Sequence, residues 1–399
     1  MRIIFRILLV ATLSLVGFQS VSAQQPSNLQ VNDLKYPYEF GSYIQFEGQL
    51  LLPSPPSEAF LMLRIEGDPS TRVLPLELDS NGNFKLRYDV KQNPLRPFAE
   101  INYSFRVKLL DGVEMVSQED GFRYEDNRFK WQVLSSEGIT VHWHDAELLF
   151  GQQALDVAMR GVKKADDLLG IDQSWSADIY IYSSSVELAE ALEIGGLSVV
   201  GGHALPDLNL GLVAISPGPQ QKLEMEQKIP HELGHVATYQ LVKNRYDRLP
   251  AWLIEGIATQ VELFPDPNYT LILKDASRQG NLISMKELCD SFPQTGDKNM
   301  LAYAEAQSFT RYIIDKYGQT GFLALTKSYG DGLDCELGSK QALGVQLSEL
   351  DILWRSDVLG ENTFFQAVKK LLPYLLILLV LLLVSSFSVI SMKRFKDER

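Results

Sequence analysis

The sequence predicts a multidomain chain with an all-β N-terminal domain, then an α+β domain, then one C-terminal transmembrane helix. Apolar and polar residues alternate through most of residues 40–127, which is the period of half-buried strands. From about residue 221 onward the apolar spacing is mainly helical, and residues 371–390 are almost unbroken Leu, Ile and Val. A length of 399 residues is compatible with two or three domains.

Composition excludes two broad classes of protein. Hydrophobic residues make up 45% and charged residues 22% of the chain, as in ordinary globular proteins, so global disorder is excluded. The 37 Lys and Arg residues are outnumbered by 50 Asp and Glu residues, which gives a net charge of −13. Because nucleic-acid binding needs clustered Lys and Arg, the chain is not expected to bind nucleic acid.

The N-terminus is predicted to be a secretory signal peptide over residues 1–23. Arg2 and Arg6 precede an apolar stretch that is too short to span a bilayer comfortably. Val21-Ser22-Ala23 then offers small residues where a signal peptidase cleaves. The alternative interpretation is a retained N-terminal anchor.

The C-terminus is predicted to span a membrane over residues 371–391, after a juxtamembrane linker at 361–370. Twenty helical residues extend about 30 Å, which is the thickness of the hydrocarbon core. Basic residues in the tail, 392–399, place that tail in the cytoplasm. The bulk of the chain is therefore predicted to be extracytoplasmic, attached to the cell membrane by a single helix.

The β domain is assigned to residues 24–127. Leu61, Leu63 and Ile65 alternate with polar neighbours, and Asn81-Gly82 and Asp111-Gly112 are hairpin signals between such runs. Strands at this spacing, with no helical pattern among them, predict an immunoglobulin-like sandwich.

The α+β domain is assigned to residues 128–360. Its β half has helical patterns between its strands, at about residues 145–169 and 186–192, and is followed by a mainly helical half from about residue 221. The domain contains both cysteines of the chain, Cys289 and Cys335. In an oxidising compartment an even pair favours a disulfide. Two buried free thiols are the alternative.

Residues 231–235 read His-Glu-Leu-Gly-His. Two histidines four positions apart lie on one helix face, so His231 and His235 can bind one metal ion. Glu232 is placed to take a proton from metal-bound water. Glu255 follows in Trp-Leu-Ile-Glu-Gly-Ile-Ala, and two His with one Glu is a standard set for catalytic zinc, which leaves a position open for water.

These motifs, completed by Glu262, resemble the gluzincin metallopeptidases, the thermolysin-type clan, and more narrowly the bacterial peptidase MA-like domains. The resemblance covers about residues 128–360 and implies a zincin-type fold. It implies one zinc ion per chain bound by His231, His235 and Glu255, with Glu232 as the general base. Glu262 would accept a hydrogen bond from a ligand histidine, or would be a plain exposed helix carboxylate.

Gluzincins stabilise the oxyanion with a Tyr or His. No histidine follows His235, so a tyrosine is needed, and Tyr303 is the predicted donor. Tyr312 and Tyr317 are rivals, and a purely structural tyrosine is a further alternative. By analogy with the fold, residues 212–216 are predicted to be the edge strand beside the substrate groove.

Pro230 directly precedes the first histidine, and proline disfavours a helix interior. Either the metal-binding helix begins near Ile229, or residues 222–228 form a separate helix that is joined at a kink.

The predicted function is therefore that of a membrane-anchored extracytoplasmic zinc metallopeptidase acting on peptides or proteins. The alternative is a cell-envelope binding or assembly protein with a non-catalytic zinc site. Structural zinc sites are usually closed by four ligands, often with Cys, and have no need of a base such as Glu232. The sequence does not indicate the oligomeric state.

Overall fold

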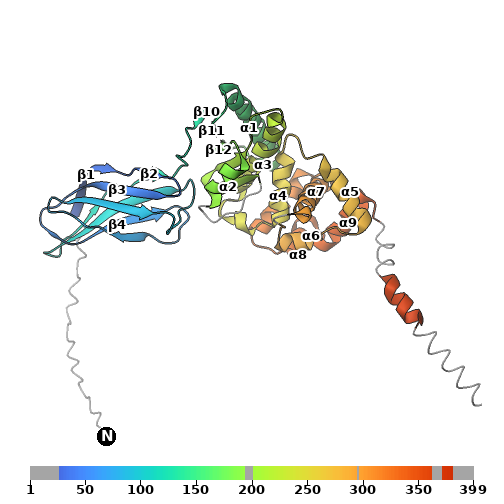
Figure 1. Ribbon diagram of the computed structural model, residues 1–399. Coiled ribbons are helices and arrows are strands. Elements are labelled where there is room, and N and C mark those ends of the chain that lie inside the picture. Colours follow the sequence, from blue (N-terminus) through green and yellow to red (C-terminus); the bar gives the residue numbers. More distant parts are fainter. Residues whose placement is uncertain (1–26, 194–200, 294–295, 362–370, 381–399) are drawn as a thin grey trace, which may run out of the picture. The chain divides into compact units, whose positions relative to one another are not determined.

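The structure is a computed structural model that describes residues 27–193, 201–293, 296–361 and 371–380. The predicted signal peptide, 1–23, lies outside the described residues. The chain divides into two compact units between Tyr124 and Glu125 (Figure 1). Each unit is described by itself below.

The first unit is built from β-strands. Its strands are β1 Ser27–Lys35, β2 Tyr38–Glu39, β3 Tyr43–Leu51, β4 Pro56–Ile65, β5 Arg72–Pro75, β6 Asn83–Asp89, β7 Glu100–Leu109, β8 Glu114–Ser117 and β9 Asp120–Arg123. Buried and exposed residues alternate along β7, as the sequence predicts for a strand with one face in a core. Gly82 has a φ of 80° in the tight turn that leads into β6, a conformation that favours glycine.

The strands of this unit form two ladders that face each other. β3 pairs with β2 and β6, whereas β4 and β7 pair with each other and with β5, β8 and β9. β1 belongs to both, because it pairs with β3 antiparallel and with β8 parallel. Rings from the two ladders meet in the core: Phe84 lies 5.0 Å from Phe105 and Phe46 lies 5.6 Å from Tyr103, between ring centroids. The unit is thus an all-β sandwich.

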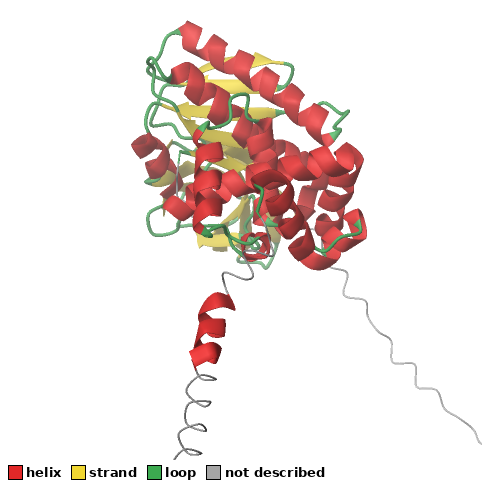
Figure 2. Cartoon of the chain, turned by 90° about the vertical axis from the view of Figure 1, so that its right-hand side faces the viewer, coloured by secondary structure: helices red, strands yellow, loops and turns green. Residues whose placement is uncertain are grey.

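The second unit combines a five-stranded sheet with helices (Figure 2). Its strands are β10 Gln132–Ser136, β11 Ile139–Trp143, β12 Ala177–Tyr182, β13 Gly202–Leu205 and β14 Leu210–Ala214. Its α-helices are α1 Leu148–Leu169, α2 Ser185–Glu193, α3 Gln221–Val242, α4 Ala251–Val261, α5 Asn268–Gln279, α6 Met285–Asp290, α7 Asp297–Gly330, α8 Cys335–Leu343 and α9 Leu347–Leu359.

The strand half of this unit is an α/β arrangement, which corrects the α+β class predicted for it. β11, β12 and β14 run parallel. Parallel neighbours need a crossover, and α1 supplies it between β11 and β12. After α3 the chain is helical, so only the second half matches the α+β expectation.

The predicted edge strand is also wrong. β14 covers most of residues 212–216, yet it lies inside the sheet between β12 and β13. The edge strand next to it is β13, which pairs antiparallel with β14, so that Gly202 faces Val213 and Ala204 faces Gly211. The chain reverses between the two strands through the short 3₁₀ helix Pro206–Leu208 and a left-handed Asn209.

Two apolar cores hold the second unit together. In the first, α1 and α3 cover one face of the sheet, where Val141, Ile179 and Val213 pack against residues of both helices. In the second, α4 and α7 pack together, and Trp252 and Phe309 meet edge to face at 4.9 Å. The α3 and α4 helices pack side by side at the boundary of these cores, which is where the predicted ligands lie.

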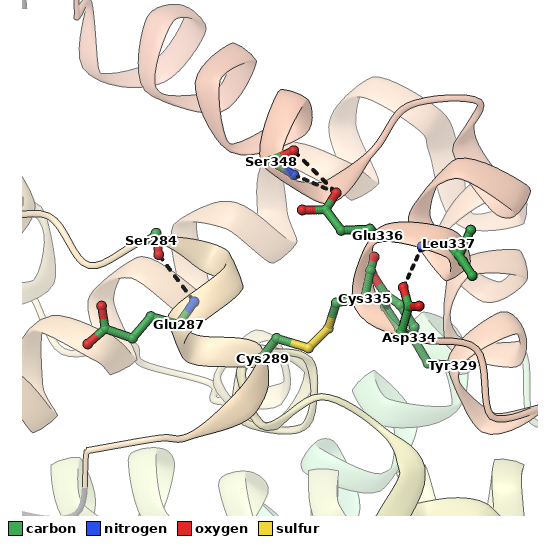
Figure 3. Close-up of a disulfide and its surroundings, with 9 residues drawn as sticks. All are labelled: Ser284, Glu287, Cys289, Tyr329, Asp334, Cys335, Glu336, Leu337 and Ser348. Carbon is green, nitrogen blue, oxygen red and sulfur yellow. Dashed lines mark hydrogen bonds between the residues drawn. A yellow bond between two sulfur atoms is a disulfide. The ribbon is translucent and has the colours of Figure 1, made fainter.

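The disulfide between Cys289 and Cys335 is present, as predicted, and joins α6 to the start of α8 (Figure 3). Both helices begin with side-chain caps. Ser284 accepts the Glu287 amide at the start of α6, and Asp334 accepts the Leu337 amide at the start of α8.

The predicted fold class included a transmembrane helix at 371–391, and this part of the prediction is wrong. Among the residues that the structure describes, no helix is both long enough and apolar enough to cross a membrane. Residues 371–380 form a short helix, and the rest of the predicted span lies outside the described residues.

Candidate metal centre

The helix α3 carries the His-Glu-Leu-Gly-His motif and runs unbroken from Gln221 to Val242 with Pro230 in its interior. Neither predicted arrangement is therefore found, because the helix neither begins at Ile229 nor divides before it. Pro230 packs against α1, where a Cβ added to Gly161 would lie 3.1 Å from the Pro230 Cβ. The absence of a side chain on Gly161 makes room for the proline ring.

Pro230 has no amide hydrogen, so it leaves the carbonyl of Glu226 without its usual partner within the helix. That carbonyl accepts two other amides, from Leu263 at 2.9 Å and from Phe264 at 3.3 Å. Both residues directly follow Glu262, at the C-terminal end of α4. The proline thus frees an acceptor that ties the end of α4 to the middle of α3.

Close contact between α3 and α4 depends on Gly234, whose added Cβ would lie 2.8 Å from the Ala258 Cα. Gly256, next to Glu255, contacts α7 and not α3. Its added Cβ would lie 2.0 Å from the Thr310 hydroxyl, so Gly256 allows α4 to approach α7. Glu255 is then held between the two contacts, facing α3.

His231, His235 and Glu255 converge, and their possible ligand atoms all lie within 4.8 Å of one another. Glu255 Oε2 is 3.4 Å from His231 Nε2 and 3.7 Å from His235 Nε2. It is buried and accepts no hydrogen bond. Ligands about 2.1 Å from one tetrahedral zinc ion are about 3.4 Å apart, so the residues present fit a zinc ion. No other such group is found among the described residues.

Each ligand histidine has a partner for its other ring nitrogen. His231 Nδ1 lies 2.9 Å from Glu262 Oε1, and His235 Nδ1 lies 3.0 Å from the Tyr246 hydroxyl. Such partners fix the ring orientation and leave Nε2 free to bind a metal. Glu262 is only 5% exposed, so it is not a plain surface carboxylate.

The electrostatics of the group favour a cation. Burial opposes protonation of His231, but the neighbouring carboxylates of Glu255 and Glu262 raise its pKa well above the usual value. Burial lowers the pKa of His235 to about 4, against the attraction of Glu255. Burial also opposes ionisation of Glu255, yet the two histidines lower its pKa. A metal ion would take the place of the proton on His231, so binding should release protons.

Glu232 lies under the edge of the sheet and is 4% exposed. A Cβ added to Gly202 of β13 would lie 2.2 Å from Glu232 Oε1, and one added to Gly211 of β14 would lie 3.0 Å from the Glu232 Cβ. The two glycines make the space that this side chain occupies. Burial raises the pKa of Glu232 to about 8; His231 opposes the shift, whereas Glu255 adds to it.

Tyr303 is the candidate tyrosine that lies beside the three ligands. Its ring centroid is 6.0 Å from that of His231, and it lies close enough to the Glu255 carboxylate to lower the pKa of that carboxylate. Burial and the negative charge of Glu255 raise its pKa, so it keeps its proton. Tyr312 instead bonds to Asp357 at 2.7 Å, and Tyr317 packs against the helical core.

Three features of the site were missed by sequence reasoning. Tyr246 lies in a 3₁₀ helix after α3 and carries no motif, so no signal pointed to it. Gly202 follows another glycine, a pair that is typical of a turn, although glycine in a strand can mark a close approach of another group. The role of Pro230 was missed because its effect lies in the tertiary structure: the Glu226 carbonyl that it frees accepts two amides from the end of α4.

The comparisons with known proteins agree with this geometry. A sequence model of the Peptidase MA superfamily matches residues 157–360, slightly more than half of the chain. A search of curated protein sequences finds no significant match.

The solved structures that match are distant in sequence and have low TM-scores. The M1 zinc metallopeptidase from Deinococcus radiodurans aligns at 13% identity with a TM-score of 0.38, over 82% of this chain and 94% of its own. OgpA from Akkermansia muciniphila aligns at 19% identity with a TM-score of 0.21, over 25% of this chain and 28% of its own. The family therefore rests on the sequence match and on the motifs of α3 and α4, and the chain belongs to the Peptidase MA superfamily.

Proposed function

We propose that the chain is a zinc-dependent metallopeptidase that hydrolyses peptide bonds in peptides or proteins outside the cytoplasm. One observation carries the proposal. The possible ligand atoms of His231, His235 and Glu255 converge, and the buried Glu255 Oε2 among them has no hydrogen-bond partner. Glu232 lies on α3, the helix that carries both histidines. Three protein ligands leave a position open, as catalytic zinc sites do.

A bound zinc ion would supply a Lewis acid that polarises the scissile carbonyl and acidifies water. Glu232 is the base that accepts the proton of the attacking water and returns it to the leaving amine. Its burial suits this role because a carboxylate with a raised pKa is a stronger base near neutral pH. Glu262 and Tyr246 hold the two imidazoles in the orientation that the ligands need.

Tyr303 is proposed as the donor to the oxyanion. Its hydroxyl is protonated and lies beside a ligand carboxylate, so a small movement would bring it to a carbonyl oxygen. We expect Tyr303→Phe to retain zinc and to lower kcat about 100-fold, because one donor is removed. An unchanged kcat would exclude this role.

The extracytoplasmic location is supported by the disulfide between Cys289 and Cys335, since disulfides persist in oxidising compartments. The signal-like residues 1–23 point to the same location. Fractionation of cells, with the protein detected by antibody, would test it. Recovery in the cytoplasm with both thiols reduced would contradict the location.

The central test is zinc analysis together with peptide hydrolysis for the purified chain and for Glu232→Gln. We expect about one zinc per chain in both proteins, and hydrolysis only in the parent. Glu224→Gln is the matched control, because it changes a partly exposed carboxylate on the same helix. If Glu232→Gln cleaves as fast as the parent, Glu232 is not the base. If the parent binds zinc but cleaves nothing, the alternative of a binding protein is favoured.

A further inference from the structure

A pocket of about 670 Å³ opens among the helices of the second unit. Its walls are one face of α5, with Thr270, Lys274 and Arg278 one turn apart, and one face of α7. Thr259 and Gln260 contribute from the end of α4. The volume is within the range of small-molecule sites, about 300–1,000 Å³. None of the proposed zinc ligands or catalytic residues lines it.

The charge of this pocket is opposite to that of the chain. Four cations line it, from three helices: Lys164 of α1, Lys274 and Arg278 of α5, and Arg311 of α7. Asp315 is the one acidic residue in the lining. The whole chain has a net charge of −13, so this local excess of positive charge is unusual for it.

Few of these cations are neutralised by a carboxylate. Lys274 has no hydrogen-bond or ion-pair partner within the part of the chain that the structure describes. Arg311 and Arg278 each contact a carboxylate of their own helix, both at 3.4 Å and both exposed. Such exposed pairs contribute little to stability, so these guanidinium groups remain available to another anion.

Lys164 is the most buried of the four cations, and the positive charge of Arg311 acts on it. It is partly buried, and its ammonium donates to the backbone carbonyl of Glu262. Burial lowers the pKa of Lys164, the attraction of Glu262 opposes this, and the positive charge of Arg311 adds to the lowering. An anion between Lys164 and Arg311 would relieve their repulsion.

The remaining lining is a mixture of polar side chains and a smaller apolar part. Leu273 and Pro265 lie on one side, and Val358 and Leu359 at the end of α9 lie on the other. Val358 is 48% exposed, so part of this apolar surface faces solvent. A ligand that uses the whole pocket needs a charged group for the cations and an apolar body for these side chains.

We infer that this pocket binds a small amphipathic anion, with a phosphate or carboxylate group against Lys164, Lys274 and Arg311 and an apolar body against Leu273 and Val358. The site is separate from the proposed metal centre and does not depend on the proposed function. The two adjoin at Glu262, whose backbone carbonyl bonds to Lys164 and whose carboxylate bonds to His231.

Calorimetric titration of the full zinc-loaded chain tests the site with three probes: hexyl phosphate, inorganic phosphate and hexanol. We expect hexyl phosphate to bind, inorganic phosphate to bind more weakly, and hexanol not to bind over the same range. The double variant Lys274→Glu with Arg311→Glu should weaken hexyl phosphate binding at least about tenfold, because two attractive charges become repulsive. Lys222→Glu, a reversal of an exposed charge on α3, is the matched control and should change little.

Two outcomes would overturn the site. One is the absence of binding at millimolar hexyl phosphate. The other is equal binding by the parent and by the double variant, which would place the anion elsewhere. Binding at the metal centre would be recognised because His231→Ala would abolish it while the pocket double variant would not. Hexanoate in the same titration tests a carboxylate group in place of the phosphate. Binding of hexanoate by the parent that weakens in the double variant supports the site.

Discussion

Glu232 illustrates how much of the site is decided by single atoms. Its carboxylate lies where a side chain on the edge strand would be, because Gly202 of that strand has none, and Gly211 of the neighbouring strand leaves room for the Glu232 Cβ. The carboxylate is thereby held between α3 and the sheet, and the same burial raises its pKa to about 8. The position of the proposed base and its strength therefore have one cause.

Gly202→Ala tests this dependence. The added Cβ would lie 2.2 Å from Glu232 Oε1, so the carboxylate must move. We expect zinc content to be retained and kcat to fall by up to about 100-fold, since a displacement of about 1 Å can have that effect. The readouts are metal analysis and steady-state kinetics.

A compensating variant separates this from a general loss of structure. Glu232→Asp shortens the side chain by one methylene and makes room for the new methyl group. The further loss of kcat that Gly202→Ala causes should be smaller in the Glu232→Asp background than in the parent. Independent, additive effects of the two changes would show that Gly202 does not position the base.

At the scale of the helices, the metal centre depends on how α3 and α4 are joined. Gly234 sets their separation at Ala258, and the freed Glu226 carbonyl holds the end of α4 through the amides of Leu263 and Phe264. Glu262 directly precedes those amides and contacts His231. A proline that weakens one helix thus fixes a neighbouring helix end.

Pro230→Ala should therefore act in two opposite directions. Alanine restores an amide that competes for the Glu226 carbonyl, so α3 is expected to gain stability while the end of α4 is released. We expect the melting temperature not to fall and zinc affinity to fall about tenfold, in the range seen when partners of metal ligands are removed. Chelator competition and thermal unfolding measure the two effects. Pro267→Ala, at an exposed helix start, is the control, and a lower melting temperature with unchanged zinc affinity would refute the proposed role.

The sequence predicts what is local and misses what is set by tertiary contacts. His231 and His235 are predictable because a helix fixes residues four apart on one face, and the convergence of Glu255 follows from the family resemblance. The disulfide follows from there being only two cysteines. The edge strand was assigned wrongly because β13 is only four residues long and shows no alternation of its own.

At the scale of the whole second unit, one carboxylic acid in the helical core links several elements. Glu305 of α7 is fully buried and accepts the Ile283 amide at 2.9 Å. Asp351 and Arg355 of α9 hold the same segment, since Asp351 accepts the Met285 amide and Arg355 donates to the Ile283 carbonyl at 2.8 Å. The start of α6, the helix that carries Cys289, is therefore held by hydrogen bonds from both α7 and α9.

The stability of this arrangement should depend on pH through Glu305. Burial raises its pKa to about 8, against the Ile283 hydrogen bond and the charge of Arg355. The unfolded value is near 4.5, so the folded state binds the proton more tightly. The contribution of Glu305 is therefore fully present below about pH 4.5 and is lost as the pH rises through about 8.

Glu305→Gln removes this titration and keeps a carbonyl oxygen for the Ile283 amide. We expect the parent to lose more unfolding free energy than the variant between pH 5 and pH 8.5, so that the variant is relatively more stable at the alkaline end. Denaturant unfolding of the zinc-loaded, disulfide-bonded chain at several pH values measures this difference. Glu349→Gln, which removes an exposed carboxylate, is the control. Parallel pH profiles for the parent and Glu305→Gln would mean that Glu305 is ionised in the folded protein, with Arg355 as its counter-charge.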